Sequence, residues 1–501
     1  MMDDRTPVLI GAGQLTQRDI EPAEAKEPLG MMVEVAQRAA VDAGAGAHLL
    51  ERLDTVAVVN ILSWHYGNQP GLLAERLGAR PSQQIYTTVG GNTPQFLINE
   101  IAAQIASGHV RCALIAGAEA VRTLLRARRA GVELRWTSGG TGSPTVLGEA
   151  KHGTNDHEVN HGLHLPTTIY PLFENALRAH YGRGLEAHRD RLGALCSGLS
   201  AVAAHNPYAW FQQQRSAAEI TTVTPQNRFI GFPYPKYMNA IMEVDQAAAV
   251  LMTSVAGARE LGIDPSRCVY LWGAADAHDL WFISERVNYF SSPAIRLAGQ
   301  KALAMAGIDV AQIDYFDIYS CFPSAVQIGR DMLSVAADDP RPLTVTGGLP
   351  YHGGPGNNYV MHAVATMMDK LRAAPGTKGL VTGLGWYVTK HSIGIYSAAP
   401  PARAWQREEP SAYQPQLDRM AHPALTTSPQ GRGTIETYTV LHDRDGTPVK
   451  GIVIGRLADG QRFLANTPDD RAVLEALMSK EGVGRTGAVS PINGTNRFEL
   501  G

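Results

Sequence analysis

Short and long apolar segments alternate along the first 120 residues. Continuous apolar runs at residues 7–13, 55–59 and 111–117 predict buried strands. Residues 29–43 and 93–108 carry apolar side chains at helical spacing, which predicts two helices between those strands. Strands that alternate with helices are typical of an α/β protein, and we expect a mostly parallel sheet with helices on both faces.

The same order of elements occurs a second time. In the first copy a helix ends at Gly44, a strand follows, and Gly90-Gly91-Asn92 opens another helix. In the second copy a helix ends at Gly307, a strand covers residues 315–318, and Gly353-Gly354-Pro355 is expected to open a helix. The copies lie roughly 260 residues apart, which is too long for a solenoid period and predicts a duplicated domain. We expect the two helix N-termini to meet near the axis that relates the copies.

Residues 121–235 interrupt this rhythm and are richer in Arg, His, Gly and Pro. Helical patterns at residues 172–181 and 185–204 predict an α-rich insertion folded over one face of the sheet. The pattern therefore divides the chain into an N-terminal half (1–120 plus 236–267), the insertion (121–235), a C-terminal half (268–400), a linker (401–430) and a last domain (431–501).

The last domain has a two-residue period. Apolar and polar side chains alternate at residues 433–440, 450–456 and 461–466, and Asp445-Gly446 and Asp459-Gly460 supply turns between them. One short helix is expected at residues 470–480. The pattern predicts a small antiparallel β-barrel.

Composition limits the classes of protein that fit. The chain of 501 residues has a net charge of −3, which does not favour a nucleic-acid binder. Its four cysteines form no CxxC pair, so we expect neither a disulfide framework nor a metal site. The polar start and the lack of an apolar run near ~20 residues predict a cytoplasmic protein with no membrane partner.

Several motifs, in order along the chain, resemble those of the thiolase superfamily. They are the duplicated halves, the insertion between them and the run from Asp245 to Leu251. More closely, the runs Tyr319–Ser324, Gly347–Asn358 and Trp386–His391 are similar to those of thiolase-like proteins of type 1, a group with an additional C-terminal domain. The resemblance implies a five-layer α/β thiolase fold with an OB-like C-terminal barrel. Proteins of this fold often form homodimers through a sheet edge near the nucleophile helix, but the extra barrel can cover surface, so the oligomeric state stays open between a monomer and a homodimer.

The resemblance also implies chemistry on acyl-CoA thioesters, as in an acetyl-CoA acetyltransferase of lipid metabolism. Thiolases use a cysteine that takes the acyl group, a histidine that activates it, a second cysteine as acid and base, and an oxyanion-binding side chain. The matching positions here are Gly91 (or Gly90), Gly354, Gly383 and Tyr319. None of them keeps the family's residue, so the usual acyl-cysteine route is not expected.

The groups beside these positions are the candidates for chemistry. We predict catalytic roles for Tyr319, Cys321, His352 and His391, each with a core or loop position as the alternative. Glycine lets a ligand approach the backbone of a helix N-terminus, where free N–H groups carry a partial positive charge. The predicted substrate-binding residues are Gly90, Gly91, Asn92, Gly353, Gly354, Asn357 and Asn358.

Three functions remain open. The first is an enzyme that transfers acyl groups or makes or breaks a carbon–carbon bond of an acyl-CoA, with no bound cofactor and without the nucleophilic cysteine. The alternatives are an inactive acyl-CoA-binding protein and an interaction module that acts through the C-terminal barrel.

Overall fold

A mixed β-sheet runs through the body of the protein. The structure is a computed structural model and describes residues 3–501. The strands of this sheet are β1 (Pro7–Thr16), β2 (Thr55–Val58), β3 (Gln83–Thr87), β4 (Cys112–Ala120), β5 (Thr145–Leu147), β8 (Asp245–Ser254), β9 (Val269–His278), β10 (Tyr315–Asp317), β11 (Lys378–Gly385) and β12 (Lys390–Ser397). Within residues 3–501 they form one ten-stranded sheet in the order β10-β11-β12-β9-β1-β8-β4-β2-β3-β5.

The expectation of a mostly parallel sheet is wrong. β2 pairs in parallel with β3 and β4, but β8 runs antiparallel to β1 and β4, and β12 runs antiparallel to β9 and β11. The first residue of β8, Asp245, lies opposite the last residue of β4, Ala120. The insertion therefore returns the chain to the same end of the sheet at which it left, and the next strand must run in the opposite direction.

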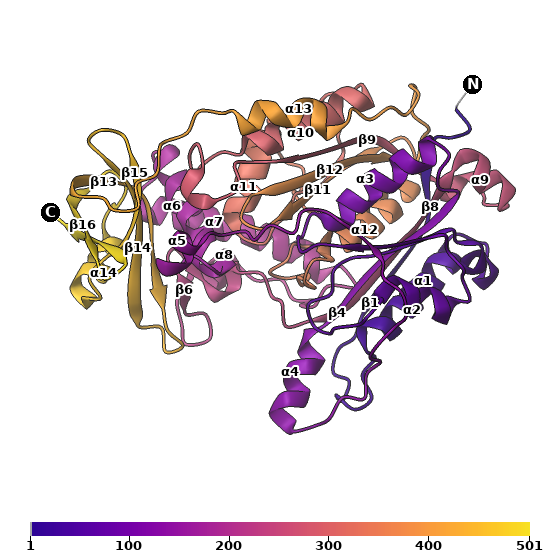
Figure 1. Ribbon diagram of the computed structural model, residues 1–501, viewed down its shortest axis with the longest axis horizontal. Coiled ribbons are helices and arrows are strands. Elements are labelled where there is room, and N and C mark those ends of the chain that lie inside the picture. The colour runs from indigo at the N-terminus through magenta and orange to yellow at the C-terminus, as the bar shows by residue number, and fades with distance from the viewer. Residues whose placement is uncertain (1–2) are drawn as a thin grey trace.

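Helices form layers inside and outside this twisted sheet (Figure 1). Those of the two halves are α1 (Pro28–Asp42), α2 (Gln69–Leu77), α3 (Thr93–Ala106), α9 (Val255–Glu260), α10 (Pro293–Ala306), α11 (Pro323–Met332) and α12 (Tyr359–Ala373). α3 and α12 pack against each other and against strands of both halves, whereas α1 covers β1, β4 and β8, and α10 covers β9 and β12. The thiolase-like α/β fold predicted from the sequence is confirmed, with α3 and α12 in the middle layer.

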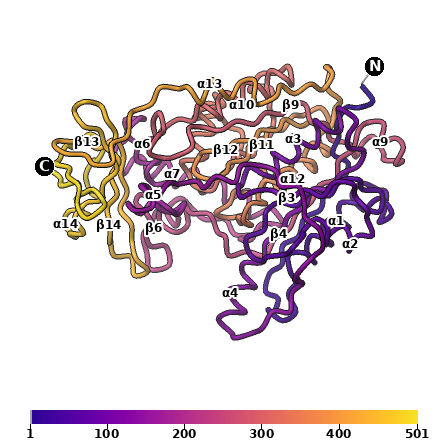
Figure 2. The backbone as a smooth tube through the Cα atoms, in the orientation of Figure 1, coloured from indigo at the N-terminus to yellow at the C-terminus, as the bar shows by residue number. Residues whose placement is uncertain are grey.

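The insertion supplies most of the remaining helices. It holds α4 (Val121–Ala130), α5 (Asp156–Asn160), α6 (Pro166–His180), α7 (Leu185–Ala204), α8 (Ala217–Thr221) and the short strands β6 (Phe229–Gly231) and β7 (Tyr234–Pro235). α4 projects from the body of the molecule (Figures 1 and 2). β5 also belongs to this stretch, but it pairs in parallel with β3 and so covers an edge of the main sheet. That edge is where the sequence resemblance placed the contact of a homodimer.

The C-terminal domain closes into a barrel at one end of the molecule, far from the N-terminus (Figures 1 and 2). Its elements are β13 (Gly431–His442), β14 (Pro448–Leu457), β15 (Arg462–Asn466), α14 (Arg471–Ser479), β16 (Thr486–Ile492) and β17 (Thr495–Leu500). β13 pairs with β14 and β16, and a parallel contact between β15 and β17 closes the barrel. The predicted small barrel is confirmed.

The segment before the barrel is more ordered than a linker. It contains α13 (Pro410–Asp418), whose Tyr413 hydroxyl donates to the carbonyl of Asp276 on β9 at 2.6 Å. Among the helices of residues 3–501, none has the length and apolar character needed to cross a membrane.

A buried arginine joins the barrel to the body. Arg462 has 0 % of its side chain exposed and pairs with Glu436 at 2.8 Å. The same guanidinium donates to the carbonyls of Ser284, at 3.2 Å, and Arg286, both outside the barrel. Because the charge is fully desolvated, it is stable only while these acceptors stay in place.

We therefore expect Arg462→Met to lower the free energy of unfolding by about 3–5 kcal/mol, since Glu436 and two carbonyls would lose their shared donor. Urea unfolding followed by circular dichroism measures the change. Arg471→Met is the matched control, because the Arg471–Glu475 pair also lies in the barrel but is 75 % and 52 % exposed. Equal unfolding midpoints for the two variants would contradict the joint described here.

Candidate active site at the start of helix α3

The starts of the two middle helices are connected by hydrogen bonds. α3 begins directly after Gly90-Gly91-Asn92, as predicted, and the N–H of Gly90 donates to Asn357 Oδ1 at 2.9 Å. Asn357 also donates from Nδ2 to the carbonyl of Asn60 at 3.0 Å, and Asn358 donates to the carbonyl of Gly117 at 2.8 Å. The two asparagines thus hold backbone segments of both halves together at the place where the sequence put the substrate.

The second glycine pair does not open a helix, which corrects the prediction for Gly353 and Gly354. α12 begins at Tyr359, and its N-cap residue is Asn358. Gly353, with φ of 107°, and Gly356, with φ of 54°, have left-handed backbone conformations that cannot continue into a helix. They form the turn that carries the chain into α12.

Tyr319 fills the space beside Gly91, the position at which the sequence resemblance puts the thiolase nucleophile. A Cβ atom at Gly91 would overlap the Tyr319 hydroxyl and would lie 2.6 Å from the carbonyl oxygen of Leu384. Tyr319 follows β10, and its backbone N–H donates to Thr382 Oγ1 at 2.9 Å. Its ring meets Tyr359 of α12 edge to face, with 5.7 Å between centroids. Position 91 therefore accepts glycine alone while Tyr319 keeps this orientation.

Of the four predicted catalytic residues, Tyr319 and His391 come together. Both line a cavity of about 10 Å³ beneath α10 and α11, which is close to the smallest volume that holds one water molecule. The His391 ring is buried, with Nε2 3.4 Å from the carboxylate of Asp279. The cavity thus brings a phenol-bearing and an imidazole-bearing residue, two groups used in general acid–base chemistry, to one place.

The other two candidates lie outside that cavity within the described chain. His352 is fully buried, 5.8 Å from the Tyr359 ring and 5.0 Å from the His362 ring between centroids, and burial lowers its pKa to about 4. Cys321 is hydrogen-bonded to Tyr170, and burial raises the pKa of its thiol to about 12. With these pKa values His352 is a weak base and Cys321 stays a protonated thiol at neutral pH, which does not suit a cysteine nucleophile activated by a histidine.

Lys390 is a functional candidate that the sequence reasoning passed over. Its amine donates to the carbonyl of Val89 at 2.6 Å and lies beside Gly90, next to the start of α3. It borders a pocket of about 320 Å³ formed by α3, β9, the start of β12, α13 and the segment after β5. The signal in the sequence was a lysine that begins an otherwise uncharged strand, and this pattern is easily interpreted as a solvated strand end.

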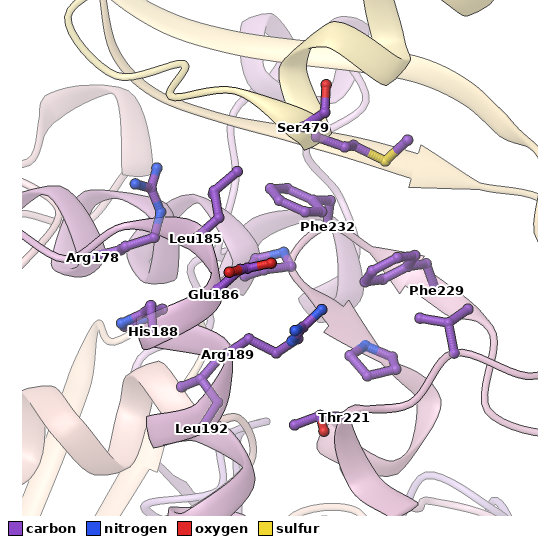
Figure 3. Close-up of a pocket in the computed structure, with 14 residues that line it drawn as sticks. Arg178, Leu185, Glu186, His188, Arg189, Leu192, Thr221, Phe229, Phe232 and Ser479 are labelled. Atoms are coloured by element: carbon purple, nitrogen blue, oxygen red, sulfur yellow. The ribbon is translucent and has the colours of Figure 1, made fainter. Parts of the chain in front are cut away.

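A second pocket lies between the insertion and the barrel (Figure 3). It has a volume of about 370 Å³, and Leu185, Phe229 and Phe232 line it together with Arg189. We call it the seam pocket.

A buried chain of hydrogen bonds leads inward from the seam pocket. His188, in the pocket wall, contacts Glu174 at 2.7 Å, and Tyr234 bridges Glu174, at 2.5 Å, and Ser324, at 2.9 Å. Ser324 is in the first turn of α11, shortly after Cys321 in the chain. The chain of contacts connects the seam pocket with the region of Tyr319.

The contact between Gly91 and Tyr319 predicts a double-mutant cycle. Gly91→Ala should lower the free energy of unfolding by about 1–3 kcal/mol through overpacking, and the loss should shrink in a Tyr319→Ala background. Denaturant titration of the four proteins measures the coupling. Gly354→Ala is the control, because the nearest atom to its added Cβ is a flexible leucine methyl 3.1 Å away. Equal losses at Gly91 in both backgrounds would show that Tyr319 does not fill that space.

Comparison with known proteins identifies relatives of the chain and of its C-terminal domain. Residues 413–493 match the family model for the thiolase-like protein type 1 additional C-terminal domain. The crystal structure of a monomeric SCP2-thiolase-like protein type 1 from Mycobacterium smegmatis is 36 % identical, covers 100 % of both chains and superposes with a TM-score of 0.86.

More distant similarity extends to enzymes. An acetyl-CoA acetyltransferase of Schizosaccharomyces pombe is 34 % identical over 150 residues, which is 29 % of this chain and 35 % of that protein, so the match spans about a third of the curated relative. The Ltp2-ChsH2(DUF35) aldolase shares the fold at 17 % identity, with a TM-score of 0.59 over 78 % of this chain and 98 % of the other. On the full-length match to the Mycobacterium smegmatis structure, this chain belongs to the SCP2-thiolase-like protein type 1 family of the thiolase superfamily.

Proposed function

We propose that the protein acts on acyl-CoA thioesters, by acyl transfer or by making or breaking a carbon–carbon bond, without an acyl-cysteine intermediate. The observation that carries this proposal is the Tyr319 hydroxyl in the space of the nucleophile. The cysteines support it as well, because burial raises the thiol pKa to about 11 for Cys268 and about 12 for Cys112, Cys196 and Cys321. Reduced, buried thiols also agree with a cytoplasmic location.

Tyr319 would act as a hydrogen-bond donor in this proposal. Burial raises its pKa well above the ordinary value of tyrosine, so the phenol keeps its proton at neutral pH. A neutral phenol near the positive end of α3 can stabilise a thioester oxygen or an enolate as negative charge develops. His391, across the same small cavity, would accept or return the proton.

The alternative is a protein that binds an acyl-CoA and does not turn it over. The size of the cavity between Tyr319 and His391, about 10 Å³, favours it, since a substrate carbonyl would need these side chains to move. A third function is an interaction module that acts through the barrel. Its support is that the barrel forms one wall of the seam pocket.

The seam pocket is our proposed docking place for the ligand. Its apolar wall suits an acyl or pantetheine chain, and Arg189 lies exposed in the same wall, where it can meet a phosphate. The buried hydrogen bonds from His188 to Ser324 would transmit occupancy toward Tyr319.

Calorimetric titration of the full chain with CoA and a series of acyl-CoA esters tests binding. We expect micromolar affinity that changes with the acyl chain, and an affinity at least about tenfold weaker for Leu185→Trp, whose ring would fill the seam pocket. Leu165→Trp, an exposed leucine of the insertion outside the pocket lining, is the control and should bind as the wild type does. Absence of heat at millimolar ligand would exclude both acyl-CoA functions.

Turnover distinguishes the enzyme from the binding protein. Tyr319→Phe removes the phenol and keeps the ring, so we expect cleavage or transfer of an acyl-CoA to fall about 10²-fold, as for a lost oxyanion donor. Release of free CoA followed with a thiol reagent measures the rate. Tyr315→Phe, on β10 and away from the cavity lining, is the control. If chromatography shows no conversion of any bound ester and no free CoA is released, by wild type or variant, the inactive alternative replaces the enzyme.

A further inference from the structure

Lys390 is a buried amine without a counter-ion. The residue is 8 % exposed, and its one hydrogen bond in the described chain goes to the carbonyl of Val89 at 2.6 Å. Across residues 3–501 the amine forms no ion pair. An uncompensated charge in such a place is costly, so the neutral form of the amine is favoured.

The start of α3 favours the neutral amine as well. The amine nitrogen is 2.8 Å from the position of a Cβ at Gly90, so it lies directly beside the first residues of the helix. The N-terminus of a helix carries partial positive charge, which repels an ammonium group. Burial lowers the pKa of Lys390 to about 8, and the carboxylate of Glu149 opposes that shift.

The other titratable groups that line the pocket have partners of their own. Asp276 on β9 pairs with Arg407 at 2.8 Å, and His278 on β9 contacts the carbonyl of Asp279 at 3.0 Å. His391, the neighbour of Lys390 on β12, faces Asp279. Glu149, an exposed residue after β5, is the carboxylate whose charge raises the pKa of the amine against the effect of burial.

The pocket beside the amine can hold a small organic molecule. Its volume is about 320 Å³, and Phe96, Ala277 and Trp281 give it apolar walls. Two buried oxygens at its amine end, Asn92 Oδ1 and Thr88 Oγ1, have no hydrogen-bond partner in the part of the chain that the structure describes. The amide nitrogen of Asn92 is held by Ser392 at 3.2 Å, so the free oxygen keeps its place.

We propose that in this pocket, which shares Asn92 and His391 with the candidate active site, Lys390 forms a reversible imine with an apolar ketone or aldehyde. The amine nitrogen bonds to the carbonyl carbon, and the carbonyl oxygen takes a proton from the nitrogen to become a hydroxyl. Loss of that hydroxyl with the second amine proton releases water and leaves the C=N bond. Asn92 and Thr88 bind the hydroxyl of the intermediate. The site needs no CoA and no cysteine, so it goes beyond the proposed acyl-CoA function.

Acetylacetone tests the proposal on the full-length protein. A neutral lysine attacks one of its carbonyl groups, loses water and gives a conjugated enaminone that absorbs in the near ultraviolet. We expect one equivalent to form near pH 7.5 and peptide mapping to locate it at Lys390, at least about tenfold faster than at a surface lysine with a pKa near ~10.4. Lys390→Met should abolish the band, and Lys236→Met, at an exposed lysine, should leave it unchanged.

A second measurement needs no variant and covers the case in which Lys390→Met fails to fold. Competitive acetylation of wild-type protein at several pH values reports the reactivity of every lysine in one sample. Because the neutral amine is the nucleophile, the rate at Lys390 should rise with pH and level off above pH 8, whereas exposed lysines continue to gain reactivity to about pH 10. Modification spread evenly over exposed lysines, or a Lys390 profile equal to theirs, would overturn the proposal. Both outcomes are independent of acyl-CoA binding.

Discussion

Space at the start of α3 is the constraint on which the site depends. A Cβ at Gly383 would lie 2.8 Å from the Cα of Asn92, so the end of β11 passes directly against the helix start. Tyr319 enters from the end of β10 and takes the last open volume beside Gly91. Each of these approaches requires a residue without a side chain, because interiors packed at this density do not yield to an added methyl group. The glycines are therefore the means by which both halves close around one tyrosine.

The same packing decides the charge states of the chemical groups. Burial keeps the phenol of Tyr319 and the thiol of Cys321 protonated, keeps His352 uncharged and lowers the pKa of Lys390. An acyl-cysteine mechanism needs a thiolate, and burial raises the pKa of the thiols and so disfavours that form. Burial favours neutral hydrogen-bond donors and a neutral amine, which suits stabilisation of an oxyanion and addition to a carbonyl group.

The pattern of neighbouring residues was sufficient to predict the two repeated units and the start of α3, because both features depend on residues that are close together in the sequence. It was not sufficient to predict the direction of the strands, since the return of β8 beside β4 depends on a segment of more than a hundred residues between them. The turn at Gly353 and Gly356 looked like a helix start because glycine permits both. The hydrogen bonds of the Asn357 amide and of the Lys390 amine join segments that lie about 300 residues apart in the sequence. The pattern of neighbouring residues does not record contacts over such separations. The chemical roles of the predicted site residues remain predictions.

Intact mass after incubation with an acyl-CoA that the protein binds tests the central claim most directly. We expect no acyl group on a cysteine. Any adduct that does form should therefore resist hydroxylamine, as an amide does. An acyl group on Cys321 or another cysteine, released by hydroxylamine as a thioester is, would contradict it. That result would mean that a buried thiol becomes reactive when substrate binds.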